Sequence, residues 1–324
     1  ATDKHTERHT ICMHPRQKTQ PHMDTPNTPH KAGFVNIIGN PNVGKSTLMN
    51  RLVGERLSII TSKAQTTRHR ILGIVSGPDF QIVYSDTPGV LKPKYKLQES
   101  MLEFSRSALS DADVLVYVTD TVEQPDKNND FLTRVQSMAA DGTPVLVVIN
   151  KIDLTTPEKL EELVAWWHTA LPTAEIIPVS AQEGFNVEPV IKRIVSLLPE
   201  GPAYYPKDTL TDKSLRFFAS EIIREKILTH YDKELPYSVE VAIESYEESP
   251  TLDRIGAVIY VSRQSQKGII IGHRGTKLKQ VGTEARKDLE AFLGKKVFLE
   301  IFVKVAEGWR DNDRALRQFG YNND

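Results

Sequence analysis

The chain has 324 residues and a formal net charge of -1, with 26% charged and 39% hydrophobic residues. These values are typical of a globular protein with two domains, and they exclude a uniformly basic nucleic-acid binder. The single cysteine, Cys12, excludes an intrachain disulfide framework and a thiolate metal site, and no apolar run approaches the roughly 20 residues that span a bilayer.

Residues 1–30 differ from the rest in composition. They contain four prolines, many threonines and glutamines, and five of the nine histidines. His5, His9 and His14 have the side chains for a metal site, but no apolar segment accompanies them to build a core. We therefore expect a disordered leader, or a segment foreign to the mature protein, and the missing apolar stretch excludes a secretory signal.

A glycine-rich loop follows an apolar run at 34–38 and precedes a helical pattern at 45–53. In this order, backbone N–H groups and the helix dipole face one bound anion. We expect Lys45 to reach the β- and γ-phosphates of a nucleotide and Ser46 to bind Mg²⁺. A turn that binds nothing is disfavoured, because the flanks fit the motif. The predicted phosphate loop comprises Gly39, Asn40, Pro41, Asn42, Val43, Gly44, Lys45, Ser46 and Thr47.

From residue 31 to 198, strand patterns alternate with helical patterns. This alternation predicts an α/β domain with a mostly parallel, doubly wound sheet and a ligand at the carboxyl ends of the strands. Prolines and a glycine at 199–202 then mark a boundary, so 199–212 is predicted to be a linker. The expected strands are 34–38, 71–76, 80–85, 113–119, 144–150 and 175–179, and the expected helices are 45–53, 97–109, 127–140, 157–170 and 187–197.

Three short motifs follow strands of this domain. After 80–85 come Asp86, Thr87, Pro88 and Gly89, whose aspartate suits Mg²⁺ and whose glycine N–H suits a γ-phosphate. After the 144–150 strand, Asn150, Lys151 and Asp153 form N-K-x-D, and the Asp153 carboxylate can accept two hydrogen bonds that guanine gives and adenine does not. Ser180 and Ala181 follow the next strand, where a backbone N–H could donate to O6 of guanine. Together these motifs predict guanine specificity.

These motifs make the chain resemble the translation-factor-related GTPases, with a P-loop GTPase fold. The segment 63–70 resembles a switch loop, and we assign Thr67, rather than Thr66, as its Mg²⁺ ligand because Thr67 precedes Arg68 as in related loops. Together with the second domain, this segment resembles the Era family of bacterial ribosome-assembly GTPases. The resemblance implies GTP hydrolysis, with Asn42, Lys45, Thr67 and Gly89 taking part.

The residues after Gly89 depart from the Ras pattern. Ras-like enzymes place a glutamine there to orient water, whereas this chain has Val90 and Leu91, which cannot hydrogen-bond water. The resemblance implies that Asn42 instead helps to hold K⁺ beside the phosphates, where a cation neutralises developing charge. A structural role for Asn42 in the loop is the alternative.

The second domain, 213–324, is predicted to contain helices at 213–230 and 276–293 and strands at 237–246, 255–262 and 297–305. With G-x-x-G joining two helices, this order resembles a smaller α+β type II KH domain. We expect the preceding helix and an adjoining strand to form a groove for about four splayed bases. The segment from Arg263 to Lys296 contains nine Lys/Arg but three Asp/Glu, and this excess supplies local positive charge. The predicted RNA contacts are Lys267, Gly268, Ile271, Gly272, His273, Arg274, Gly275 and Lys277.

The family implies binding of the 3′ end of small-subunit ribosomal RNA during subunit maturation. It also implies a cytoplasmic location with peripheral association at the inner face of the cell membrane. Trp309 and Arg310 suit either RNA contact or a buried cap on the domain. An RNA-binding assembly protein that binds GTP with little hydrolysis is the alternative function, and an ATP-dependent small-molecule kinase is disfavoured by N-K-x-D.

Overall fold

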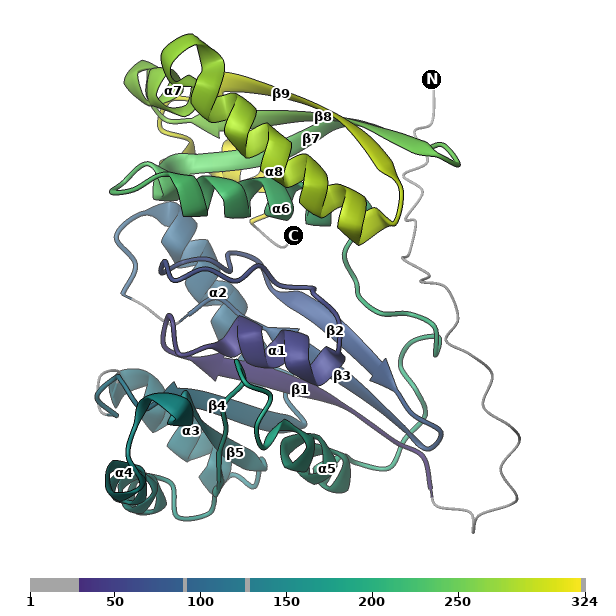
Figure 1. Ribbon diagram of the computed structural model, residues 1–324. Helices are drawn as coiled ribbons and strands as arrows, with labels where there is room; N and C mark the ends of the chain where they lie inside the picture. The colour runs from purple at the N-terminus through teal and green to yellow at the C-terminus, as the bar shows by residue number, and fades with distance from the viewer. Residues whose placement is uncertain (1–28, 90–91, 126–128, 322–324) are drawn as a thin grey trace. The chain divides into compact units, whose positions relative to one another are not determined.

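The computed structural model describes residues 29–89, 92–125 and 129–321 (Figure 1). The predicted leader up to residue 28 and the Val90–Leu91 pair lie outside this part of the chain. Contacts divide the described residues into two compact units. The first contains 29–58, 67–89 and 102–212, and the second contains 59–66, 92–101 and 213–321.

A six-stranded sheet forms the centre of the first unit. Its order is β2-β3-β1-β4-β5-β6, and every neighbouring pair is parallel except β2 with β3. All residues of β4 and β5 are buried, as expected of strands covered on both faces. The strands are β1 (Lys31–Gly39), β2 (Ile71–Ser76), β3 (Phe80–Asp86), β4 (Val114–Asp120), β5 (Val145–Asn150) and β6 (Glu175–Pro178).

Helices cover both faces of this sheet (Figure 1). Phe131, Val135 and Trp167, from α3 and α4, pack against apolar residues of β4 and β5, whereas α1 packs against β1, β3 and α5. The predicted doubly wound α/β fold is confirmed. The helices are α1 (Lys45–Val53), α2 (Lys96–Ser110), α3 (Asn129–Ala140), η1 (Ile152–Leu154), α4 (Pro157–Ala170) and α5 (Val187–Leu197).

The segment 199–212, predicted to be a linker, runs along the first unit. Isolated bridges pair Glu200 with Lys31 and Thr211 with Gly73. The Gln81 side chain also donates to the carbonyl oxygen of Tyr205 over 2.8 Å. These bonds satisfy backbone groups of the antiparallel strand β2 and its neighbours, so the segment belongs to the compact unit before it.

The second unit contains a three-stranded sheet of order β7-β8-β9, with β7 antiparallel and β9 parallel to β8. The helices α6, α7 and α8 pack on one face through residues such as Ile223, Ile270 and Val281. The predicted α-β-β-α-α-β order is confirmed. The elements are α6 (Leu215–His230), η2 (Pro236–Ser238), β7 (Val239–Glu247), β8 (Leu252–Val261), α7 (Gln264–Ile271), η3 (His273–Gly275), α8 (Thr276–Leu293) and β9 (Lys296–Val305).

The chain then covers part of the opposite sheet face with η4 (Trp309–Asp311) and α9 (Asp313–Gln318). Trp309 is 1% exposed and its indole N–H donates to the carbonyl oxygen of Ser238 over 3.0 Å. Trp309 is therefore a buried cap on the domain, which was one of the two roles expected for it, the other being RNA contact. Among the described helices, none combines the length and the apolar composition needed to cross a membrane.

Candidate functional site

The phosphate loop lies between β1 and α1, at the carboxyl edge of the central sheet. Gly39 has φ 149, and a Cβ there would lie 2.1 Å from the Val118 carbonyl oxygen. Gly44 has φ 94, and a Cβ there would lie 2.2 Å from Nδ2 of Asn150. Only glycine fits at either position, because both the backbone conformation and the space exclude a side chain. The loop therefore brings its backbone close to neighbouring strand ends and leads directly into the N-terminus of α1.

Lys45, the first residue of α1, is buried within this loop. Its Nζ donates to the carbonyl oxygens of Gly39 over 3.1 Å and Asn40 over 2.7 Å. Burial lowers the pKa of Lys45 to about 8, against the opposing effects of Asp86 and Glu123. A buried ammonium that is hydrogen-bonded to carbonyl oxygens is well placed to bind an anion such as phosphate.

Four oxygen-bearing side chains converge beside the loop. The Ser46 hydroxyl donates to Asp86 Oδ2 over 2.8 Å and lies 2.8 Å from the hydroxyl of Thr67. Ser58, which the sequence did not indicate, also donates to Asp86 Oδ2, over 2.7 Å. Among the described residues, Oδ1 of Asp86 is buried without a hydrogen-bond partner, and burial raises the pKa of this carboxyl. Such a buried carboxylate oxygen, on a carboxylate beside the hydroxyls of Ser46, Thr67 and Ser58, fits a hard divalent cation.

The residues after Asp86 continue along the phosphate loop. The Thr87 hydroxyl donates to the Ile37 carbonyl oxygen over 2.9 Å. Pro88 accepts a bond from the Ser105 hydroxyl over 2.8 Å, and a Cβ on Gly89 would lie 2.6 Å from Cα of Pro41. The glycine therefore permits the close approach of two backbones at the place where a terminal phosphate is expected.

The residues predicted to recognise the base are joined to the phosphate loop by Asn150. Its Nδ2 donates to the Val43 carbonyl oxygen over 2.9 Å, and its Oδ1 accepts from the Ala181 N–H over 3.0 Å. The hydroxyl of Ser180 donates to Asp153 Oδ1 over 2.5 Å, which orients the exposed carboxylate. The structure thus brings all three predicted motifs together, and Asn150 acts here as a bridge between loops.

Two carboxylates at the end of β4 belong to the same site and were missed by the sequence reasoning. Asp120 pairs with Nζ of Lys151 at 2.5 Å, and Glu123 accepts from Nδ2 of Asn40 over 2.9 Å. The sequence feature that could have indicated them is their position after a predicted strand, because the carboxyl end of β4 lies between those of β1 and β5.

In the second unit, the G-x-x-G segment forms η3, a tight turn between α7 and α8. Gly272 and Gly275 have φ 73 and 75, and Arg274 has φ 49. A Cβ on Gly272 would lie 2.8 Å from the Lys277 side chain, whereas around Gly275 nothing lies within 4 Å. The turn presents its backbone with little shielding, as phosphate contact requires.

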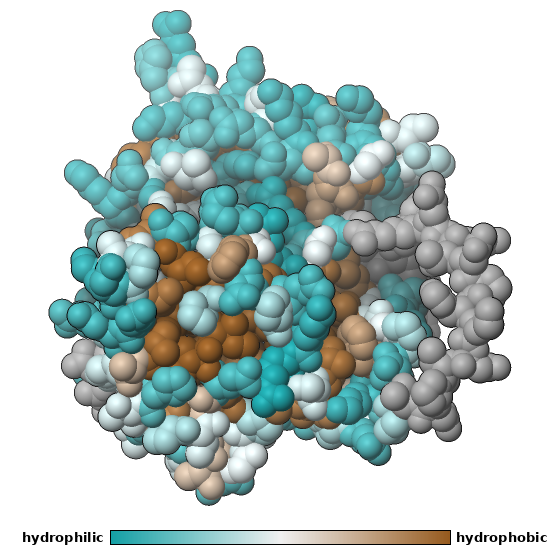
Figure 2. All heavy atoms as spheres, turned by 60° about the horizontal axis from the view of Figure 1, so that its bottom comes forward, coloured by the Kyte–Doolittle hydropathy of each residue, from teal (hydrophilic) through white to brown (hydrophobic). Residues whose placement is uncertain are grey.

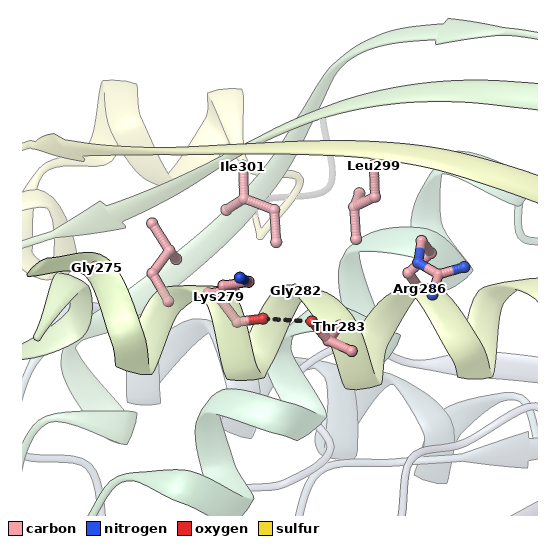
Figure 3. A pocket seen from close by; sticks show the side chains of 8 residues that line it. Gly275, Lys279, Gly282, Thr283, Arg286, Leu299 and Ile301 are labelled. Atoms are coloured by element: carbon pink, nitrogen blue, oxygen red, sulfur yellow. Dashed lines mark hydrogen bonds between the residues drawn. The ribbon is translucent and has the colours of Figure 1, made fainter.

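A hollow of about 380 Å³ runs between α8 and β9. Figure 3 shows Leu299 and Ile301 of β9 directed toward α8, with Lys279 and Arg286 along the helix. Gly282 faces this hollow, where an added Cβ would make only an ordinary contact of 3.5 Å with Ile301. The lining consists of Gly275, Leu278, Lys279, Gly282, Thr283, Arg286, Leu299 and Ile301.

The location of this hollow differs from the groove expected from the sequence. The helix that lines it follows the G-x-x-G turn, whereas α7, which precedes the turn, packs into the core through Ile270 and Ile271. Gly275 is the only predicted RNA-contact residue that lines the hollow. Of the others, Lys277 lies with Nζ 5.7 Å from the ring centroid of Tyr231. The remaining predicted contacts are Lys267 and Gly268 on α7 and Gly272, His273 and Arg274 at the turn.

A second hollow lies on α4 of the first unit. Figure 2, which brings the lower part of Figure 1 forward, shows hydrophobic side chains gathered among hydrophilic ones. Glu161 and His168 are the only ionisable groups in the lining of the hollow, which is otherwise apolar, so it offers little to hold a nucleotide. The lining is Pro157, Leu160, Glu161, Val164, Ala165, His168 and Pro178.

Comparison with known proteins relates both units to described families. A model of the 50S ribosome-binding GTPases matches residues 34–151, and a KH domain model matches residues 234–310. The GTPase Era of Alkaliphilus metalliredigens is 45% identical over 294 residues, which are 90% of this chain and 99% of that protein. The chain belongs to the Era family of GTPases. The maize chloroplastic GTPase ERA1 is also 45% identical, over 90% of this chain and 71% of its own length.

Solved Era structures match over nearly the whole chain. An Aquifex aeolicus Era variant bound to GDP·AlF4⁻ has a TM-score of 0.86 and 40% identity, covering 90% of this chain and 100% of its own. Era bound to MgGDPNP and nucleotides 1506–1542 of 16S ribosomal RNA has the same TM-score and identity, covering 91% and 100%. As a member of the Era family, the chain is a GTPase that hydrolyses GTP to GDP and phosphate, with a P-loop GTPase domain and a KH domain.

Proposed function

We propose that this Era-family GTPase binds the 3′ end of small-subunit ribosomal RNA through its KH domain and assists assembly and maturation of the small ribosomal subunit. The observation that carries the proposal is the match to the solved Era complex with 16S ribosomal RNA, which extends over 91% of this chain. The alternative of GTP binding with little hydrolysis is disfavoured by the equally close match to Era bound to GDP·AlF4⁻.

The nucleotide site is proposed to consist of the phosphate loop, Asp86–Gly89, and the residues around Asn150 and Ser180. Ser46, Thr67 and Asp86 would hold Mg²⁺, which supplies charge neutralisation at the phosphates. The Lys45 ammonium neutralises phosphate charge, and the Gly89 N–H donates to the terminal phosphate. The buried, partnerless Asp86 oxygen supports the metal assignment, because it offers an acceptor for a cation.

We extend the proposal to a K⁺ ion held with the help of Asn42. This residue has φ 68, a left-handed conformation that asparagine tolerates, and it lies in the phosphate loop. Its carbonyl oxygen accepts from Lys151 Nζ over 2.6 Å. The residue type and its position in the loop support a role for the side chain beside the phosphates.

RNA contact is proposed at the G-x-x-G turn and in the hollow between α8 and β9. The turn would hold the sugar-phosphate backbone, while Leu299 and Ile301 would pack against bases. Lys279 and Arg286 add positive charge along the same hollow, where a polyanion would lie.

We propose residues 31–198 as the GTPase domain, 199–212 as a connection that packs along this domain, and 213–324 as the RNA-binding domain. The two family matches, at 34–151 and 234–310, support this division. A cytoplasmic location with peripheral contact at the inner face of the cell membrane is supported by the family resemblance, and co-sedimentation with lipid vesicles tests the membrane contact.

The decisive experiment blocks the hollow without straining the fold. Gly282→Leu places a side chain into the space beside Ile301, and leucine favours the helix that contains this position. Binding of single-stranded RNA matching the small-subunit 3′ end should fall at least about tenfold, since base contacts of 1 to 3 kcal/mol each are lost. Unchanged RNA binding by a folded Gly282→Leu variant, with GTP hydrolysis intact, would contradict the proposed RNA site.

A further inference from the structure

The segment at the end of β4 contacts the first half of the phosphate loop directly at two places and through Lys151 at a third. The Val118 carbonyl oxygen lies against Gly39, where a Cβ would approach to 2.1 Å. The Glu123 carboxylate accepts from Nδ2 of Asn40 over 2.9 Å. Nζ of Lys151, which pairs with Asp120, donates to the Asn42 carbonyl oxygen over 2.6 Å.

Glu123 is itself held firmly. Its second carboxylate oxygen accepts from the Thr119 hydroxyl over 3.1 Å. Asp120 Oδ1 accepts the backbone N–H groups of Val122 over 2.9 Å and Glu123 over 2.8 Å, which closes the turn. The carboxylate that reaches Asn40 is therefore fixed by both its side chain and its backbone.

A carboxylate beside a phosphate site weakens binding through charge alone, because it repels the polyanion. Its presence here is explained by what it holds. Asn40 is 3% exposed, and its carbonyl oxygen accepts the Lys45 ammonium over 2.7 Å. Glu123 thus holds Asn40, which in turn holds the Lys45 ammonium.

We propose that Glu123 is a positioning residue for the GTPase reaction: it fixes Asn40 and thereby preorganises the phosphate loop and Lys45. The inference rests on the proposed nucleotide site. None of the G motifs includes Glu123, and it acts on the nucleotide through Asn40.

The test compares GDP dissociation rates of Glu123→Ala, Glu123→Gln, Asn40→Ala and the double alanine variant. The matched control is Val122→Ala, in the same turn, because Val122 is 69% exposed. Glu123→Ala should release GDP at least about fivefold faster, as expected for the loss of a hydrogen bond to a charged group. Glu123→Gln keeps an acceptor and should restore most of the wild-type rate.

The double variant distinguishes positioning from a general loss of stability. If Glu123 acts through Asn40, the double variant should release GDP no faster than whichever single variant releases it faster, so the two effects are not additive. Additive effects, or equal GDP dissociation rates in Glu123→Ala and Val122→Ala, would overturn the inference. The nucleotide site itself would still stand as long as the wild type binds GDP. If the wild type bound no GDP, the proposed nucleotide site would fail instead. If Glu123→Ala fails to fold, Glu123→Asp serves the same comparison with Asn40→Ala, because the shorter side chain should not reach Asn40.

Discussion

Asn150 Nδ2 donates to the carbonyl oxygen of Val43 over 2.9 Å, so the N-K-x-D motif is bonded directly to the phosphate loop. The other end of the same amide accepts from the Ala181 N–H over 3.0 Å. Because the side chain is 2% exposed, no water replaces these bonds if the amide is removed. One side chain thus connects the three loops that are proposed to surround the nucleotide.

Asn150→Ala should consequently destabilise the nucleotide-free protein as well as weaken nucleotide binding. Each of the two backbone groups left unpaired costs about 1 to 3 kcal/mol. Urea unfolding of the nucleotide-free protein measures the first effect and GDP titration the second. A variant of wild-type stability would show that water or a local shift replaces both bonds.

Asp153→Asn should exchange a preference for guanine for a preference for xanthine. The carboxylate accepts from the guanine N–H groups, whereas the new amide donates to the carbonyl that xanthine carries at that edge. GTP affinity should fall by at least about a hundredfold relative to XTP affinity. Competition between the two nucleotides measures the exchange, with stability expected to be unchanged because Asp153 is exposed. Retained preference for GTP would refute the assignment of this carboxylate.

GTP hydrolysis should be faster in K⁺ than in Na⁺ at equal ionic strength. The larger cation is proposed to lie beside the phosphates with the help of Asn42 and to neutralise charge that develops during the reaction. Asn42→Ala should abolish the difference between the salts. Phosphate release measured in both salts tests this, and equal wild-type rates would remove the cation and leave water positioning to a partner.

Replacing both loop residues, His273→Asp and Arg274→Asp, should weaken single-stranded RNA binding at least about tenfold. Two carboxylates then lie where phosphate is expected, and repulsion with lost contacts costs about 1 kcal/mol or more at each position. Aspartate tolerates the left-handed backbone of Arg274, at φ 49, so the turn should persist. Filter binding of RNA and a GDP titration on the same variant provide the readout and its control. Undiminished RNA affinity would place the RNA elsewhere.

The nucleotide-free protein should gain stability as pH rises from about 8 toward 10. The folded pKa of Lys45 is lowered by burial from 10.5 to about 8, so between these values the unfolded chain binds more protons than the folded one. Stability therefore increases with pH in this window. The increase ends where tyrosines of the unfolded chain begin to ionise, because burial raises the pKa of Tyr84 in the folded protein. Thermal unfolding of the wild type and Lys45→Met should reveal the gain only in the wild type. An identical pH response in both would contradict it.

The amino-acid sequence by itself determined the phosphate loop, N-K-x-D and the G-x-x-G turn, because each depends on neighbouring residues. Gly39 and Gly44 are required by local backbone conformation, and Asp153 lies in the loop that follows a buried strand ending at Asn150. The order of elements was likewise predicted, since apolar periodicity reflects which face of each strand or helix is buried.

The tertiary structure decided the contacts between residues far apart in the chain. Glu123 meets Asn40 only because β4 lies next to β1, which brings together residues 83 positions apart. The hollow beside Ile301 forms after the G-x-x-G turn because α8, rather than α7, packs along β9 there, while α7 is drawn into the core by Ile270. Such contacts depend on how the elements pack. The pattern of neighbouring residues in the sequence does not specify which strand ends will be adjacent.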